Sequence, residues 1–143
     1  MNIVQQPHFL RTVLLVDAVT CLATGLLMTV GAGTLSPLTA IPTDLLVYAG
    51  VSLFPVAAFI IFVATRPEPP VLGVWLVIFG NVAWVAGSVW LLSGGALSPT
   101  ALGEAFIALQ AAAVAVLAGL EYAGLRWDAS HGLQPGSSNR MPS

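Results

Sequence analysis

Charged residues are scarce in this sequence. Of its 143 residues only 7% are charged and 57% are hydrophobic, and lysine is absent. Soluble domains carry about 25% charged residues, so this chain cannot cover itself with a polar surface. The formal net charge of -2 also excludes the strongly basic surface that binds nucleic acids. We therefore expect an integral membrane protein in contact with the lipid bilayer and without a nucleic-acid partner.

The residues that build most catalytic and cofactor sites are equally sparse. A lone Cys21 cannot form an intrachain disulfide or a Cys-x-x-Cys site. His8 and His131 lie outside the hydrophobic runs, and the His-Glu-x-x-His and phosphate-loop patterns are absent. We expect no metal site, no cofactor, no catalytic residue and no enzymatic activity.

Long hydrophobic runs are what the sequence does contain. A helix needs about 20 apolar residues to cross a bilayer, and four runs reach that length: 12–32, 44–65, 71–92 and 100–123. Segments rich in glycine and proline separate the runs. The sequence therefore predicts an all-α fold, a four-helix transmembrane bundle that forms one domain over residues 1–128. The polar segment 129–143 predicts a disordered C-terminal tail.

An internal similarity at a spacing of 62 residues links the two halves of the chain. The first set is Gly25, Gly33, Leu35, Ser36 and Pro37, and the second is Gly87, Gly95, Leu97, Ser98 and Pro99. A duplication would give two repeated helical hairpins. Convergence explains the pattern equally well, because glycine and Ser-Pro end and start helices.

The arginines predict the orientation in the membrane. Arg11 precedes the first run, Arg66 separates the second from the third, and Arg126 and Arg140 follow the fourth. Four spans place all of these on one side, which the positive-inside rule identifies as the cytoplasmic side. We expect a multi-pass protein of the cell inner (plasma) membrane with both termini in the cytoplasm.

Asp17 is the one acidic residue well inside the first hydrophobic run. Thr20, Cys21 and Thr24 follow it at helical spacing, so this mildly polar stripe should face other helices instead of lipid. One interpretation is a proton or ion site. The favoured one is a hydrogen-bonded carboxyl that joins the first helix to a neighbour, for example through Trp75, because no second ionisable residue is expected at that depth.

Four further polar residues form two expected pairs. Asn81 and Gln110 each lie about ten residues into their runs, at nearly the same depth, which predicts a hydrogen bond between them. Asp44 and Glu104 lie at the outer starts of the second and fourth runs, where they could form an acidic, cation-attracting vestibule.

The fourth run also carries small residues at helical spacing. These are Ala108, Ala111, Ala115 and Ala118, a stripe that lets helix backbones approach closely. Such a stripe is compatible with packing inside one bundle, with a homo-oligomer and with a larger membrane complex.

Two segments of the fourth run carry a family resemblance. At "LSPTALGEAFIALQA" and "LEYAGLRW" the chain resembles small uncharacterised bacterial four-span integral membrane proteins, over residues 11–127, but the resemblance brings no functional residues. Small multidrug transporters share the length and the number of spans. Their acid in the first helix is a glutamate and their charge bias is weak, whereas this chain has Asp17 and a strong bias.

Two functions are compatible with these features. The favoured one is a structural or accessory membrane module that oligomerises or accompanies a larger complex. The alternative is a small proton- or cation-coupled transporter or channel that uses Asp17, Glu104 or both.

Overall fold

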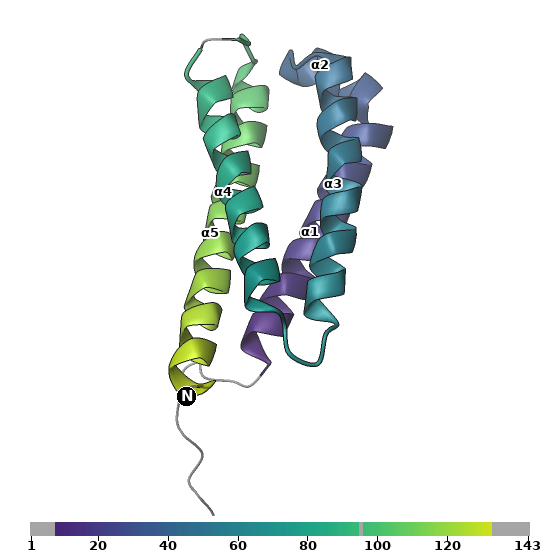
Figure 1. The fold of residues 1–143 in the computed structure, drawn as a ribbon. Helices are drawn as coiled ribbons and strands as arrows, with labels where there is room; N and C mark the ends of the chain where they lie inside the picture. Colours follow the sequence, from purple (N-terminus) through teal and green to yellow (C-terminus); the bar gives the residue numbers. More distant parts are fainter. Residues whose placement is uncertain (1–7, 95, 133–143) are drawn as a thin grey trace, which may run out of the picture.

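The protein is a bundle of α-helices in which the described residues contain no strand. The computed structural model describes residues 8–94 and 96–132. The helices are α1 (Phe9–Val30), α2 (Ala32–Thr39), α3 (Thr43–Ala64), α4 (Val71–Leu92) and α5 (Ala101–Gly132) (Figure 1).

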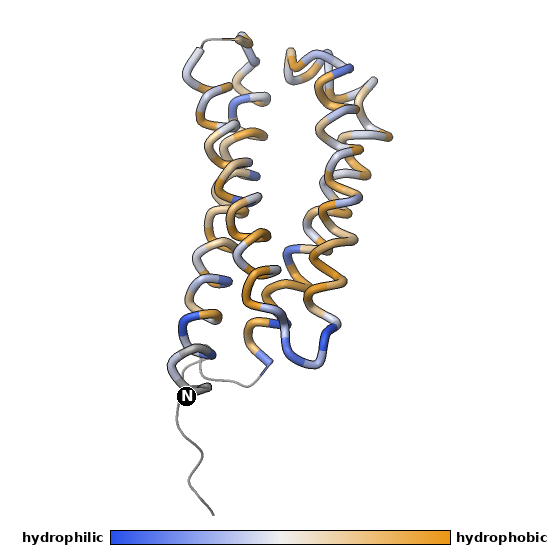
Figure 2. Tube along the Cα trace, in the orientation of Figure 1, coloured by the Kyte–Doolittle hydropathy of each residue, from blue (hydrophilic) through white to orange (hydrophobic). Residues whose placement is uncertain are grey.

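Four of these helices are long and apolar enough to cross a membrane. The candidate spans are Phe9–Val30, Thr43–Ala64, Val71–Leu92 and Ala101–Asp128. Hydrophobic residues run along all four long helices (Figure 2). Many of them lie on the outside of the bundle, where for example Phe79 is 74% exposed. Side chains of this kind are stable when they contact lipid. The predicted all-α four-helix bundle is confirmed, and its surface fits a multi-pass membrane protein.

The long helices pack as two hairpins. α1 lies along α3, and α4 lies along α5 (Figure 1). The two hairpins meet mainly through α1 and α5, whereas α3 and α4 contact each other in few places although they are consecutive in the chain. The hairpin architecture agrees with the internal similarity, and the duplication itself stays a prediction.

Two boundaries differ from the sequence-based expectation. The segment expected to be an outer loop after the first run contains a short helix, α2, with Pro37 inside it. α5 continues to Gly132, well beyond the expected boundary at residue 123, because no proline interrupts it and the buried Gly124 is tolerated inside the helix. The first four residues of the predicted tail are thus helical, and residues 133–143 lie outside the described residues.

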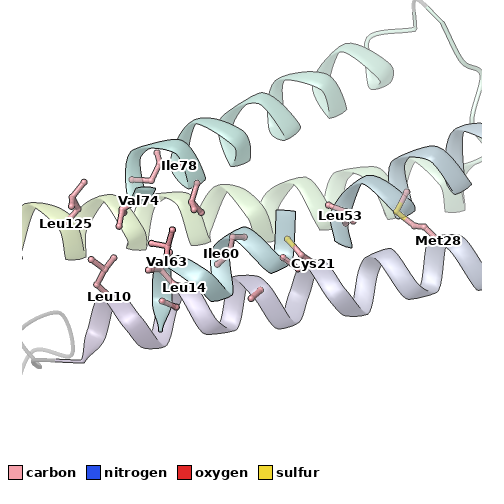
Figure 3. Close-up of a cluster of buried hydrophobic side chains, with 14 of the residues drawn as sticks. Leu10, Leu14, Cys21, Met28, Leu53, Ile60, Val63, Val74, Ile78 and Leu125 are labelled. Atoms are coloured by element: carbon pink, nitrogen blue, oxygen red, sulfur yellow. The ribbon is translucent and has the colours of Figure 1, made fainter. Parts of the chain in front are cut away.

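One end of the bundle carries Arg11, Arg66 and Arg126, and we call it the arginine end. There Arg11 Nη2 donates to the backbone carbonyls of Arg66 and Pro67, at 2.8 and 3.1 Å. Buried aliphatic side chains from all four long helices pack just inside this end, among them Leu10, Leu14, Val63, Val74 and Leu125 (Figure 3). This packing closes the bundle at the arginine end.

The opposite end, which we call the loop end, holds α2 and residues 93–94 and 96–100. Thr100 joins them, since its backbone N–H donates to the Thr39 carbonyl at 3.0 Å and its hydroxyl donates to the Leu38 carbonyl at 2.7 Å. Gly103 packs so closely on the Thr39 carbonyl that a Cβ would have no room there. α2 therefore ties the first hairpin to the start of α5.

Candidate functional site

Two acidic side chains meet inside the bundle. Asp17 of α1 and Glu121 of α5 are both 0% exposed. Asn81 of α4 lies between them, and its Nδ2 donates to Asp17 Oδ2 at 2.7 Å and to Glu121 Oε2 at 3.2 Å. Because one nitrogen contacts both oxygens, the distance between Asp17 Oδ2 and Glu121 Oε2 cannot exceed the sum of these two distances. We call these three residues the acidic site.

The second oxygen of each carboxyl has little or no hydrogen bonding. Asp17 Oδ1 accepts only a weak contact from Cys21 Sγ, at 3.8 Å. Glu121 Oε1 is buried, and no described residue donates to it. A buried acceptor of this kind is costly to leave unpaired.

The described arginines do not neutralise this pair. Arg11 is engaged with backbone carbonyls at the arginine end. Arg66 lies over the Phe62 ring, with 3.9 Å from Cζ to the ring centroid. Arg126 donates to the Tyr122 hydroxyl at 3.4 Å. Within the described residues, the neutral amide of Asn81 is the closest compensation that the two carboxyls receive.

Two neighbouring carboxylates cannot both stay ionised here without a positive charge. Removing an ion from water costs several kcal/mol even after relaxation, and two like charges repel each other strongly where no water screens them. The pair can instead share one proton, as adjacent carboxyls do elsewhere, or hold one cation. No group of three or more His, Cys, Asp or Glu side chains suited to a metal ion occurs among the described residues.

A small cavity of about 90 Å³ adjoins the acidic site. Cys21 and Asn81 line it, together with the hydroxyl-bearing residues Thr20, Thr24 and Ser52. Hydroxyl groups can exchange hydrogen bonds with a water molecule or a bound ion. The small cavity therefore brings three hydroxyl groups close to Asn81, within a lining that is otherwise largely apolar.

A large cavity of about 450 Å³ lies between the two hairpins, on the side of the loop end. Gly80, Trp84 and Gln110 line both this cavity and the small one. Trp84 Nε1 donates to Gln110 Oε1 at 2.9 Å, so a hydrogen-bonded pair lies where the two cavities adjoin. The cavities together connect the acidic site with the loop end of the bundle.

The sequence-predicted interior position of Asp17 agrees with the structure, and its partners belong to the third and fourth spans. Thr20 and Thr24 are partly buried beside it. Trp75, the partner suggested from the sequence, instead makes an edge contact with Tyr122, with ring centroids 5.9 Å apart. Trp75 does not reach Asp17 because it lies on a different face of α4. Asn81 lies on the buried face of this helix together with Val74 and Val77, whereas Trp75 is half exposed.

The expected hydrogen bond between Asn81 and Gln110 is replaced by other pairings. Asn81 contacts the two carboxyls, and Gln110 accepts from Trp84. Both residues do lie about ten residues into their helices, but depth alone does not decide which side chains meet. With the helix extending to Gly132, Glu121 lies far from the end of α5 and reaches the level of Asn81.

The outer acidic residues lie at the surface, and the small-residue stripe is only partly buried. Asp44 and Glu104 are both exposed, in the first turns of α3 and α5. In the stripe, Ala111 and Ala118 are buried, whereas Ala108 and Ala115 are exposed. The stripe therefore splits between the bundle interior and the outer surface.

Glu121 is the site residue that the sequence interpretation missed. It lies two residues before the expected end of the fourth run at residue 123, and it was not weighed there as a site residue. The sequence does contain a signal for it, because small or apolar residues flank Glu121 at helical spacing: Leu117, Ala118, Gly124 and Leu125. In the structure all four are buried. An acidic residue centred on an apolar helical face is expected to point inward.

The acidic site thus combines residues from α1, α4 and α5 that are far apart in the chain. It has two carboxyls, one amide donor and one buried oxygen without a described partner. The two cavities beside it extend towards the loop end. Comparison of the chain with protein-family models, curated proteins and solved structures finds no match.

Proposed function

We propose that this chain is a small membrane carrier in which Asp17 and Glu121 together bind one exchangeable proton. The observation that carries the proposal is the sharing of one amide by two fully buried carboxyls, with Glu121 Oε1 left without a described donor. A proton on either carboxyl removes one charge and supplies the missing donor. Ionisable residues inside membrane bundles commonly mark such proton pathways.

The asymmetry of the bundle supports a carrier more than a continuous channel. On one side of the acidic site are the small and the large cavity. On the other side, about one helical turn away, Leu14 and Leu125 belong to the aliphatic packing that closes the arginine end. A carrier exposes its binding site to one side at a time, and this arrangement corresponds to a state open towards the loop end.

A structural or accessory module is the second candidate. Ala115 and Gly119 of α5 form a shallow surface hollow with Val82 and Val85 of α4, and such a surface suits another helix. Packing between helices, however, does not require two buried acids that share one amide donor. Both candidates are non-enzymatic, and we propose that the protein catalyses no reaction, since the two carboxyls and the amide of the acidic site suit proton binding.

Infrared difference spectroscopy of the protein in lipid nanodiscs tests the proton. At neutral pH we expect a protonated-carboxyl band that disappears in both Asp17→Asn and Glu121→Gln. Glu104→Gln is the matched control, because Glu104 is exposed near the loop end and should leave the band unchanged. Absence of the band in the folded wild-type protein would overturn the proposal.

Transfer into D₂O distinguishes an exchangeable proton, which a carrier requires, from a proton that is sealed in the structure. A proton that exchanges through the small cavity should shift the band to its deuterated frequency while the helices stay folded. If the band stays unshifted until the protein unfolds, the proton is sealed in, and the accessory role replaces the carrier.

A further inference from the structure

The large cavity has the character of a ligand site. We infer that it binds an organic ammonium ion with a flat apolar body, and that this ion exchanges with the proton of the acidic site. The inference rests on the proposed function and names its substrate class.

The lining of the large cavity determines what the body of the ligand must be. Most of the lining side chains are aliphatic or aromatic, and Met28, Leu46 and Ile107 are among them. A volume of about 450 Å³ is within the range of small-molecule sites. Gly80 and Gly87 widen it, since an added Cβ at either position would meet no atom within 4 Å. An apolar ring system of moderate size fits this space.

Aromatic rings favour a positive charge on the ligand. Trp84, Trp90 and Phe106 all line the large cavity. The faces of such rings attract ammonium groups, most strongly where water is excluded. The hydrogen bond from Trp84 to Gln110 holds the indole in place, so one of these rings is already oriented.

The charges around the loop end also favour a positively charged ligand. Asp44 and Glu104 lie in the first turns of α3 and α5, the helices that supply Leu46 and Ile107 to the cavity wall. The described residues of the loop end include no arginine, and the chain has no lysine. This acidic surface attracts cations and repels anions.

The acidic site explains how binding is coupled to the proton. The ammonium head enters the small cavity past Trp84 and Gln110 and there reaches Asn81, the residue whose amide joins the carboxyls of Asp17 and Glu121. As the shared proton leaves to water, the ammonium group supplies the positive charge in its place. One cation is bound for each proton released, so charge is conserved.

Binding of a matched pair of probes tests this inference. 1-Naphthylmethylammonium carries the proposed charge, and 1-naphthalenemethanol has the same ring with a hydroxyl instead. With the wild-type protein in nanodiscs, and with empty nanodiscs subtracted, we expect saturable calorimetric binding of the ammonium probe. The neutral probe should bind at least about tenfold more weakly, which corresponds to about 1.4 kcal/mol.

Two glycine variants locate the binding. Gly87→Leu should abolish saturable binding by filling the large cavity, because Gly87 has open space on that side. Gly119→Leu is the matched control, since Gly119 also has open space but lies in the hollow formed with Val82 and Val85. It should bind the probe like the wild-type protein. Thermal unfolding of both variants checks that they are folded.

The outcomes distinguish this inference from the function on which it rests. Probe binding that releases protons into a weak buffer, and that loses this release in Glu121→Gln, supports the exchange. Equal binding of both probes overturns the ammonium class, while the carboxyl band can still establish the proton. A phospholipid retained in native mass spectrometry and lost in Gly87→Leu, or a dimer lost in that variant, assigns the cavity to lipid or to a second copy and also overturns the inference.

Discussion

At the scale of single residues, Asn81 is the link on which the acidic site depends. Its amide nitrogen is the described donor to both carboxyls, from a helix that is separate in sequence from each of them. Gln110, at first sight an equivalent amide, belongs to a different pair with Trp84. The two amides therefore have different roles, although sequence position makes them appear alike.

Double-mutant cycles should separate these roles. Asn81→Leu and Asp17→Asn share a hydrogen bond, so we expect a coupling free energy of about 0.5–3 kcal/mol. Asn81→Leu and Gln110→Leu remove different bonds and should be additive within about 0.5 kcal/mol. Reversible unfolding in mixed micelles provides the free energies. A strong coupling between Asn81 and Gln110 would contradict the pairing described above.

At the scale of helices, the first hairpin depends on a close approach of α1 and α3. Gly25 and Gly50 face each other across it, and a Cβ on Gly50 would lie 3.0 Å from the Gly25 carbonyl oxygen and 2.6 Å from Thr29 Oγ1. Small residues at such crossings allow the backbone contacts that stabilise helix pairs in lipid. The sequence interpretation took Gly25 only as part of a repeat, and did not single out Gly50.

Gly50→Ala should therefore destabilise the bundle. The Thr29 hydroxyl can rotate away, but the Gly25 carbonyl belongs to the helix backbone, so the two helices must separate. We expect a loss of about 1–3 kcal/mol, typical of overpacking, in the same unfolding measurement. Gly33→Ala is the control, because an added Cβ there meets no atom within 4 Å. Equal stability of the two variants would show that the close approach is absent.

At the scale of the whole molecule, the two ends of the bundle differ in charge and in packing. The arginines gather where aliphatic side chains close the interior, and the cavities lie towards the loop end. If the positive-inside rule applies, the acidic site communicates with the outside of the cell and is closed towards the cytoplasm.

Cysteine labelling in intact cells tests this topology. Single cysteines at positions 36 and 98, in a background with Cys21→Ala, should react with a membrane-impermeant maleimide added outside. A cysteine at position 68, in the loop between α3 and α4, should react only after the cells are opened. The reverse pattern would invert the predicted orientation.

The sequence by itself determined the class of fold. Hydrophobic runs of membrane-spanning length and few charges predict apolar helices. Lipid offers no hydrogen bonds to the backbone, and a helix pairs its polar backbone groups within its own segment. The inward orientation of Asp17 followed for the same reason, since a carboxyl on the lipid face would be too costly. These conclusions need only local composition and helical periodicity.

Only the tertiary structure decided which polar groups meet. Asp17, Asn81 and Glu121 come from three helices, and their meeting depends on how far α5 extends and on which face each helix presents. A shift of one helix by a single turn, about 5.4 Å, would break these contacts while leaving every hydrophobic run unchanged. Helix formation is a local property, whereas helix register and side-chain pairing are set by packing between distant segments, which is why the acidic site appeared only in three dimensions.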